Sequence, residues 1–177
     1  SLETDAVVLR SEGELLILDR TPFYGESGGQ VGDQGDLVTG GGRLRVVDTQ
    51  RNGSVCVHIL ETPERLEPRS KVTARVDADR RGNIMRNHTA THIVHEALRR
   101  VLGTHLRQAG SLVAPDHLRF DFNHFERITP EQLREIEEIV NEKIVAAIEV
   151  HALNDPRSWL TIDEAKAKYP NVKMFFG

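Results

Sequence analysis

Two histidines, His88 and His92, are the residues of this sequence best suited to chemistry, because they stand four positions apart in a predicted helix. Residues with this spacing lie one above the other on a helix, so two imidazole nitrogens can be directed at a single point. Zinc commonly takes imidazole ligands, but a stable zinc site has three or four protein ligands. The pair is therefore a candidate for half of a metal site, although the spacing also arises by chance in ordinary helices.

A glycine-rich stretch earlier in the chain is the second candidate. So much glycine costs backbone entropy, which only a special conformation justifies. Two interpretations stay open: a loop whose backbone approaches a substrate, through Gly28, Gly29 and Gln30, or a bulge and turn that closes a barrel. The stretch reads Thr21-Pro22-Phe23-Tyr24-Gly25-Glu26-Ser27-Gly28-Gly29-Gln30-Val31-Gly32-Asp33.

The helix that carries the histidines is predicted from about Asp79 to Leu102, with an aspartate capping its start and Gly103 ending it. At about 100° per residue, both histidines fall about 100° or more from the centre of its apolar stripe. We expect them to flank the core and to face a cleft. The stripe consists of Ile84, Ala90, Val94, Ala97, Leu98, Val101 and Leu102.

These motifs together resemble a known family. The run from Arg86 to His95, with Gly110–Val113 and Leu118–His124, resembles the editing domain of alanyl-tRNA synthetases and of the related free-standing AlaX-type deacylases. The stretch from Thr21 to Asp33 is similar to the glycine-rich motif that precedes that domain. The resemblance covers nearly the whole chain, and two long motifs in the right order make it specific to an internal editing-domain fragment.

The resemblance implies a zinc site and an activity. In the family the paired histidines, here His88 and His92, join a later Cys-x-x-x-His segment in binding zinc, and the site hydrolyses serine or glycine wrongly attached to the tRNA for alanine. No such segment occurs before Gly177, and His95 is a poorly matched third ligand. We therefore expect the zinc site to be incomplete in this chain, and the isolated fragment to be inactive.

Further site residues follow from the same resemblance. Gln108 matches a glutamine implicated in editing, although by sequence alone it is an ordinary loop amide. Ester hydrolysis needs donors for the carbonyl oxygen, and Gln108, Thr91 or the backbone of the glycine pair can supply them. Thr89 and Thr91 are candidate readers of the serine hydroxyl, with capping or packing as an equally good interpretation. Arg86 joins the glycine pair and Gln30 as a predicted substrate contact.

The expected partners are the acceptor end of tRNA(Ala) and the remainder of the synthetase chain, whose aminoacylation domain would hold ATP and magnesium. The net charge of −4 is unevenly distributed. A basic band beside the histidines and an acidic helix after residue 126 fit a protein that holds phosphates on one face, or two solvated helix faces. The arginines of the band are Arg75, Arg80, Arg81, Arg86, Arg99, Arg100 and Arg107.

Composition limits the class of protein. The 177 residues, 38% of them hydrophobic, suit one ordinary domain or two small ones. No apolar run approaches about 18 residues and no signal peptide is present, so a soluble, cytoplasmic protein without membrane contact is expected. The single Cys56 excludes an internal disulfide and an all-cysteine zinc site, and it should behave as a small buried hydrophobe.

The predicted fold is α+β. Residues 1–78 contain five or six short alternating runs with glycine corners and an Asn52-Gly53 hairpin signal, which indicate a small glycine-rich β-barrel. Residues 79–177 should form the α/β editing domain, with helices packed on a mixed, mainly antiparallel sheet. Its elements after the long helix are a hairpin of Leu112–Ala114 and Leu118–Phe125, a capped helix over 131–148, a strand over 149–153, a short helix over 163–168 and a strand over 172–176.

Three functions compete at this point. The first is the editing module of an alanyl-tRNA synthetase, and the second is part of a free-standing AlaX-type deacylase. The third is a catalytically silent module that binds tRNA or has a structural role. The full glycine motif and the helix over 131–148 fit the first best.

Overall fold

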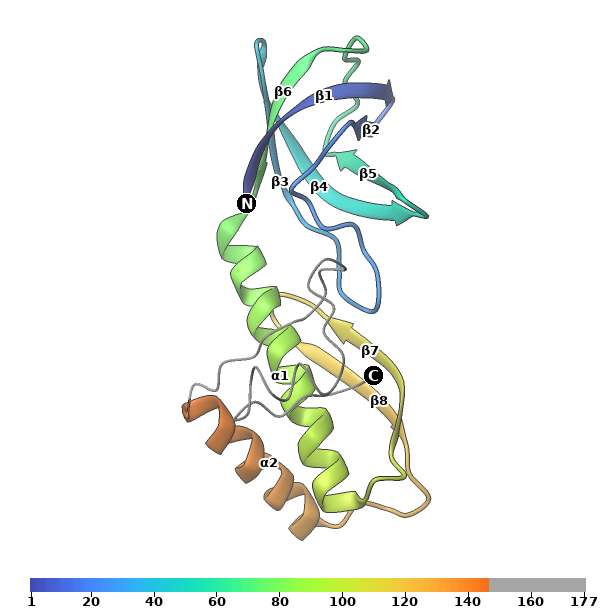
Figure 1. The fold of residues 1–177 in the computed structure, drawn as a ribbon, viewed down its shortest axis with the longest axis vertical. Helices are drawn as coiled ribbons and strands as arrows, with labels where there is room; N and C mark the ends of the chain where they lie inside the picture. The colour runs from blue at the N-terminus through green and yellow to red at the C-terminus, as the bar shows by residue number, and fades with distance from the viewer. Residues whose placement is uncertain (147–177) are drawn as a thin grey trace, which may run out of the picture.

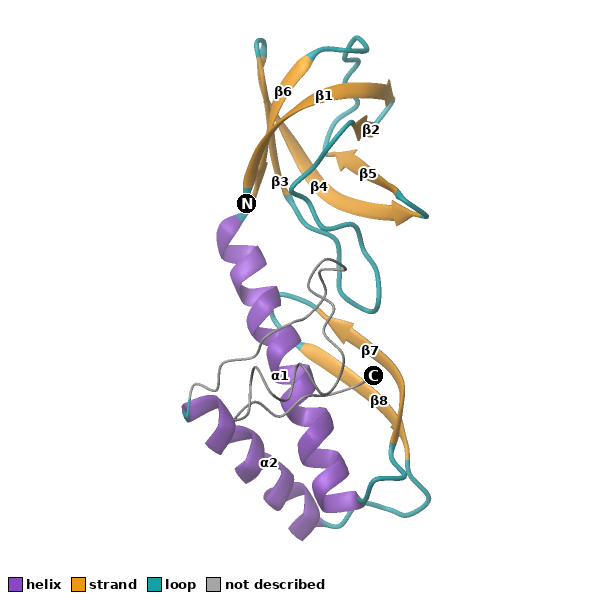
Figure 2. Cartoon of the chain, in the orientation of Figure 1, coloured by secondary structure: helices purple, strands orange, loops and turns teal. Residues whose placement is uncertain are grey.

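The computed structural model describes residues 1–146 and has a closed β-barrel, from which a long helix leads to a two-stranded sheet and a second helix (Figures 1 and 2). The predicted α+β class is confirmed. The expected strand over 149–153, helix over 163–168 and strand over 172–176 lie outside the described residues. In chain order the elements are β1 (Glu3–Glu12), β2 (Leu15–Leu18), β3 (Gly35–Thr39), β4 (Gly42–Asn52), β5 (Val55–Leu60), β6 (Lys71–Val76), α1 (Ala78–Leu102), β7 (Arg107–Val113), β8 (Leu118–Asn123) and α2 (Pro130–Val145).

The barrel is antiparallel throughout and follows the order β1-β2-β5-β4-β3-β6, with β6 pairing back to β1. Closure leaves no free sheet edge, which removes a site of aggregation. Alternate residues of each strand point inward, so the period-two pattern of the sequence becomes one apolar core. That core consists of Ala6, Val8, Leu16, Leu18, Phe23, Leu37, Val46, Leu60, Val72, Ala74 and Val76.

Two details of the barrel differ from the prediction. The strand β3 was not separately expected, because it opens with Gly35, and glycine usually weakens a strand. Here a Cβ at Gly35 would overlap the carbonyl oxygen of Arg75 on β6, so close strand approach requires the glycine. The β4–β5 turn lies one residue later than Asn52-Gly53, since Asn52 already pairs with Val55. Cys56, expected to be buried, is only partly buried.

A buried histidine joins the barrel to the start of the glycine-rich stretch. The side chain of His58 is fully enclosed, and its Nδ1 lies 3.1 Å from the carbonyl oxygen of Leu16. That oxygen can only accept, so Nδ1 carries the hydrogen and Nε2 accepts from the Thr21 hydroxyl at 2.8 Å. Thr21 in turn accepts from the amide of Phe23 at 3.1 Å. Neutral His58 thereby fixes where the glycine-rich stretch leaves the barrel.

Helix α1 has the predicted ends. The Asp77 side chain accepts from the amide of Arg80, and the amide of Gly103 donates to the Arg99 carbonyl. Of its predicted apolar stripe Ile84, Ala97, Leu98 and Leu102 are buried, whereas Ala90, Val94 and Val101 are only partly buried. Thr91, which was outside the predicted stripe, is 7% exposed. The second core, where α1 meets α2 and the hairpin, contains Ala97, Leu98, Leu102, Leu106 and Ile136 with partly buried Phe120 and Phe122.

The hairpin and α2 depart from the prediction in extent. Strand β7 begins at Arg107, five residues before the expected Leu112, so Gln108 lies in a strand and not in a loop. A bulge between Gln108 and Gly110 interrupts the pairing and hid the strand pattern. Helix α2 has the predicted Thr129 capping box. Of its predicted stripe Ile136 is buried, whereas Leu133 is 53% exposed and Ile144 52%. No helix among residues 1–146 is long and apolar enough to cross a membrane.

Acid should weaken the barrel through His58. Burial lowers the pKa of His58 from 6.5 to about 4, so between these pH values the unfolded chain binds a proton that the folded chain excludes. The stability is present at neutral pH and is lost as the pH falls through this window, by about 3 kcal/mol. Denaturant unfolding from pH 7.5 to 4 measures the loss. His58→Gln should flatten the profile and the exposed His117→Gln should not, and equal slopes in both variants would contradict this.

Candidate functional site

The glycine-rich stretch, residues 21–34, leaves the barrel between β2 and β3 and extends to α1 and β7 (Figure 1). We call it the glycine segment. Its tip is a two-residue turn, in which Ser27 and Gln30 exchange backbone hydrogen bonds at 3.0 and 3.2 Å. Gly28 (φ 59°) and Gly29 (φ 84°) occupy the two central positions, as a type I′ turn requires. The turn thus explains why two consecutive glycines are needed.

The segment pairs with β7 through a single parallel bridge between Gln30 and Val113. The amide of Val113 donates to Gly29 at 2.7 Å and the amide of Val31 donates to Val113 at 3.1 Å. A Cβ at Gly29 would overlap the carbonyl oxygen and hydroxyl of Ser111, whereas one at Gly28 would meet nothing within 4 Å. Gly29 therefore has two structural requirements, its positive φ and the close approach to β7, and Gly28 has only the first.

A buried ion pair fastens the base of the segment to α1. Asp33 is 1% exposed, and its carboxylate accepts from the Arg81 guanidinium through both oxygens, with Nε at 2.9 and 3.0 Å. The same carboxylate accepts from the amide of Tyr24 at 2.6 Å, which closes the segment on itself. Arg81 also donates to the Pro22 carbonyl at 3.1 Å, and Arg80 donates to the Gly32 carbonyl at 2.9 Å.

The tip of the segment meets the predicted metal-binding histidines. The side-chain oxygen of Gln30, a residue 8% exposed, lies 2.7 Å from Nδ1 of His88. The rings of His88 and His92 are stacked, with centroids 5.3 Å apart and planes at 21°. His95 follows on the same side of α1, and its ring packs on Phe120 at 5.0 Å. The two motifs of the sequence, 58 residues apart at this contact, thus form one cluster.

The surroundings of His92 and His95 favour their neutral imidazoles. Burial lowers the pKa of His92, and the neighbouring His88 and His95 lower it further. Burial also lowers the pKa of His95, with Arg99 acting in the same direction and Glu96 opposing it. A metal ion binds the neutral form of imidazole, so these shifts suit a ligand role.

The cluster fits half of a zinc site. Two imidazoles on successive turns of a helix are suitable zinc ligands, and Nδ1 of His88 is occupied by Gln30, which leaves Nε2 for an ion. Residues 1–146 contain no group of three or more His, Cys, Asp or Glu side chains placed to hold a metal. His95 is therefore not positioned as a third ligand in this part of the chain.

Comparison with known proteins identifies the family. Residues 1–80 match the family described as tRNA synthetases class II (A). The chain is 52% identical over 155 residues to the alanine–tRNA ligase of Chromohalobacter salexigens, which covers 87% of this chain and 17% of that protein. It is 50% identical to the ligases of Acetivibrio thermocellus and Coxiella burnetii, covering 89% of this chain and 18% of each. The chain belongs to the alanine–tRNA ligase family. It spans less than a fifth of the length of these curated relatives.

The other residues predicted for an alanine–tRNA ligase editing site have different surroundings. The Thr91 hydroxyl donates to the Asn87 carbonyl at 2.8 Å, a packing arrangement within α1. Thr89 is partly buried on the same helix. Arg86 is exposed and bonds to Asn83. It lies two residues before His88, about 200° around the helix, so the fold does not bring it to the cluster.

Gln108 reaches the cluster only through a neighbour. It lies opposite Phe122 on the helix-facing side of the hairpin, and it donates to the Ser111 hydroxyl at 3.1 Å. Ser111 is the residue that packs against Gly29, so it connects Gln108 to the turn. The sequence did not predict this connecting role of Ser111. It also did not predict the role of Asn87, whose side chain donates to the Ala114 carbonyl at 2.7 Å. Both act through backbone atoms of distant segments, for which the sequence carries no signal.

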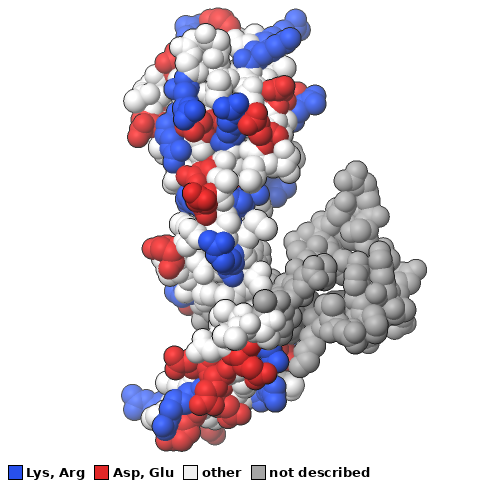
Figure 3. All heavy atoms as spheres, turned by 90° about the vertical axis from the view of Figure 1, so that its left-hand side faces the viewer, with Lys and Arg blue, Asp and Glu red and all other residues white. Residues whose placement is uncertain are grey.

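Some arginines of the predicted basic band are bound within the protein. Arg80 and Arg81 of the basic band are bound by the Gly32 carbonyl and by Asp33, so these two do not form an open phosphate-binding surface. Arg75 pairs with Glu3 at the surface of the barrel. The acidic helix is confirmed, because the glutamates of α2 are exposed and gather on the lower part of the molecule in Figure 3.

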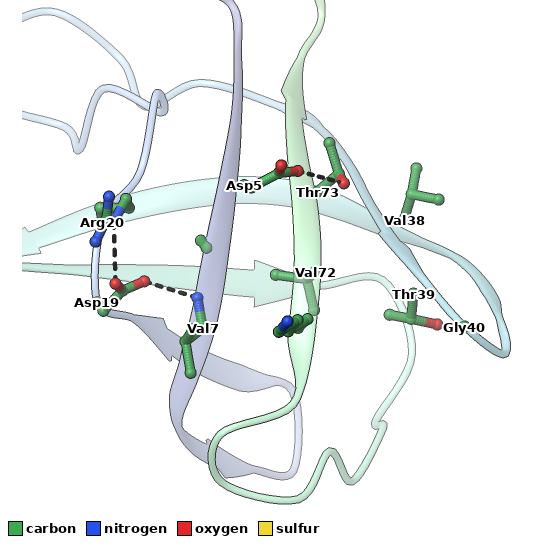
Figure 4. Close-up of a pocket in the computed structure, with 11 residues that line it drawn as sticks. Asp5, Val7, Asp19, Arg20, Val38, Thr39, Gly40, Val72 and Thr73 are labelled. Atoms are coloured by element: carbon green, nitrogen blue, oxygen red, sulfur yellow. Dashed lines mark hydrogen bonds and ion pairs between the residues drawn. The ribbon is translucent and has the colours of Figure 1, made fainter.

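A separate cavity of about 570 Å³ lies on the barrel, and no predicted site residue lines it (Figure 4). Both of its carboxylates accept hydrogen bonds from barrel strands: Asp19 accepts from the Val7 amide at 2.7 Å, and Asp5 accepts from Thr73 at 2.8 Å. These two carboxylates therefore have a structural role in the barrel.

Removing Arg81 should detach the glycine segment. Arg81→Met leaves the buried Asp33 carboxylate without its charge partner, which should cost about 3 to 5 kcal/mol of unfolding free energy. Arg119→Met breaks the exposed Arg119–Asp121 pair and should cost at most about 1 kcal/mol. Denaturant unfolding of both variants provides the test, and similar losses would show that the Asp33–Arg81 pair is no more important than a surface contact.

The two glycines of the turn should respond differently to alanine. Gly28→Ala incurs only the positive-φ cost, about 1 to 2 kcal/mol. Gly29→Ala also forces the turn away from Ser111, so the Val113 amide should lose its protection from hydrogen exchange. Amide exchange at Val113 measures this directly. Equal protection in the two variants would mean that the turn does not depend on its contact with β7.

Proposed function

We propose that this chain is the editing module of an alanyl-tRNA synthetase, which hydrolyses serine or glycine wrongly esterified to tRNA(Ala). The complete enzyme attaches alanine to the same tRNA with ATP and magnesium, in a domain outside this chain. The hydrogen bond between Gln30 and His88 carries the proposal, because it joins the glycine motif and the histidine motif into one site. The relatives are named as ligases, which favours a synthetase over a free-standing deacylase.

The reaction is hydrolysis of an ester at the acceptor end of tRNA(Ala): water adds to the carbonyl carbon and the ribose hydroxyl leaves. A zinc ion held by His88 and His92, with further ligands from outside the described residues, would polarise the water or orient the aminoacyl group. The amides of Gly28 and Gly29 donate no hydrogen bond within residues 1–146, which suits them to receive the carbonyl oxygen. Gln108 and Thr91 remain candidates for the same role.

Discrimination of serine from alanine rests on the serine hydroxyl. An aminoacylation pocket rejects an analogue with one added hydroxyl poorly, so serine calls for a second, hydrolytic site that recognises the hydroxyl. Thr89 and Thr91 are proposed to bind that hydroxyl, and Arg86 to contact the tRNA backbone. For Thr91 the hydroxyl oxygen keeps lone pairs free after donating to Asn87.

Deacylation of serine-charged tRNA(Ala) tests the function. We expect the full-length protein encoded by the gene to hydrolyse the ester and the 177-residue chain alone not to do so. His88→Ala and His92→Ala in the full-length protein should lower the rate to that of the uncatalysed ester, as should a zinc chelator. His117→Ala, at an exposed position on the β7–β8 turn, is the matched control.

Two results would contradict the proposal. Undiminished hydrolysis by the His88 and His92 variants would remove these residues from the mechanism. Binding of tRNA without any hydrolysis by the full-length protein would instead show that this part of the chain is a tRNA-binding or structural module.

A further inference from the structure

The side chain of Gln30 is held rigidly before it meets His88. Its backbone amide and carbonyl are both bonded to Ser27, at 3.0 and 3.2 Å. Its neighbours Gly29 and Val31 are both bonded to Val113 of β7. Because the residue is 8% exposed, its amide side chain has little freedom to turn away. A side chain fixed in this way can orient another residue at little entropic cost.

The bond to His88 has a specific chemical consequence. The side-chain oxygen of Gln30 can only accept a hydrogen bond, so Nδ1 of His88 must carry the hydrogen. The lone pair of the neutral ring is then on Nε2. In water the neutral imidazole of histidine prefers the opposite form, with the hydrogen on Nε2, which is unable to bind a metal through that atom.

We propose that Gln30 is a positioning residue, which fixes His88 in the Nδ1–H tautomer and presents its Nε2 lone pair to the metal ion of the editing site. This role rests on the proposed function and replaces the substrate contact predicted for Gln30. Histidines that bind metals almost always donate their other N–H to a carboxylate or carbonyl, which sets the ring orientation. Here the acceptor comes from the glycine segment, so the turn at Gly28 and Gly29 is coupled to the geometry of the metal ligand.

Long-range ¹H–¹⁵N correlation spectra of histidine-labelled, metal-free 177-residue chain at pH 8 report each tautomer. In the wild type His88 should carry its hydrogen on Nδ1. Gln30→Met keeps the side-chain shape without the acceptor and should move His88 toward the Nε2–H form. Gln30→Glu keeps an acceptor and should restore Nδ1–H, and Gln34→Met in the same segment should change nothing. His58, whose Nδ1 donates to Leu16, is an internal reference in every spectrum.

Zinc affinity of the full-length protein, measured by competition with a chelator, gives a second readout. Gln30→Met should weaken binding by about 10- to 100-fold relative to Gln34→Met, as expected when an orienting partner is lost. An Nε2–H tautomer in the wild type, or an unchanged tautomer and affinity in Gln30→Met, would overturn the positioning role.

The two readouts separate this role from the proposed function. If the tautomer and zinc affinity change as expected while the full-length protein fails to deacylate tRNA, the positioning role stands and the editing function is wrong. If the full-length protein edits but His88 has the Nε2–H form, the function stands and the role of Gln30 is overturned.

Discussion

The buried Asp33–Arg81 ion pair is the contact on which the rest of the site depends. The Asp33 carboxylate is 1% exposed, so separating it from Arg81 would leave a buried charge without a partner and strongly destabilise the fold. This keeps the glycine segment and α1 together. Arg81 and His88 are seven residues apart, two turns along one face of α1, a rise of about 10 Å. Asp33 follows Gln30 by three residues, and three residues of extended chain reach about the same distance. With Asp33 fixed at Arg81, the segment therefore delivers Gln30 to His88.

The sequence predicted the parts of the fold that follow from periodicity and capping. It did not predict the strands in which a glycine lies close to a neighbouring strand. The barrel, the ends of α1 and the Thr129 cap were all foreseen. Strand β3 and the first half of β7 were not, because Gly35 and Gly110 resemble turn residues. Gly35 is needed because the Arg75 carbonyl approaches closely, whereas at Gly110 the nearest group is the end of the Asp121 side chain. That requirement exists only after the strands have paired.

The candidate site was predictable as a set of residues but not as a set of contacts. His88, His92 and Gln30 were all named from the sequence. Gln30 and His88 are 58 residues apart, and they meet only because the glycine segment docks on α1. No local sequence pattern encodes that docking. Arg81 was predicted to belong to a basic surface, but its charge is paired with the buried Asp33 carboxylate. Sequence gives the sign of a charge, and only the fold shows whether that charge has a buried partner.

The chemistry of Gln30 suits the proposed substrate better than a carboxylate would. A glutamate at this position would also accept the Nδ1 hydrogen of His88 and would make the ring a stronger ligand. It would add a buried negative charge beside the proposed editing site, which would receive the polyanionic end of a tRNA, with a cost in desolvation and repulsion. The neutral amide fixes the same tautomer without that charge. The Asp33 carboxylate, which is negative, lies two helical turns away and is neutralised by Arg81. The glycine segment thus holds the helix through the charged Asp33 at its base and contacts His88 through the neutral Gln30, while its other acidic residue, Glu26, accepts from the Gln50 side chain.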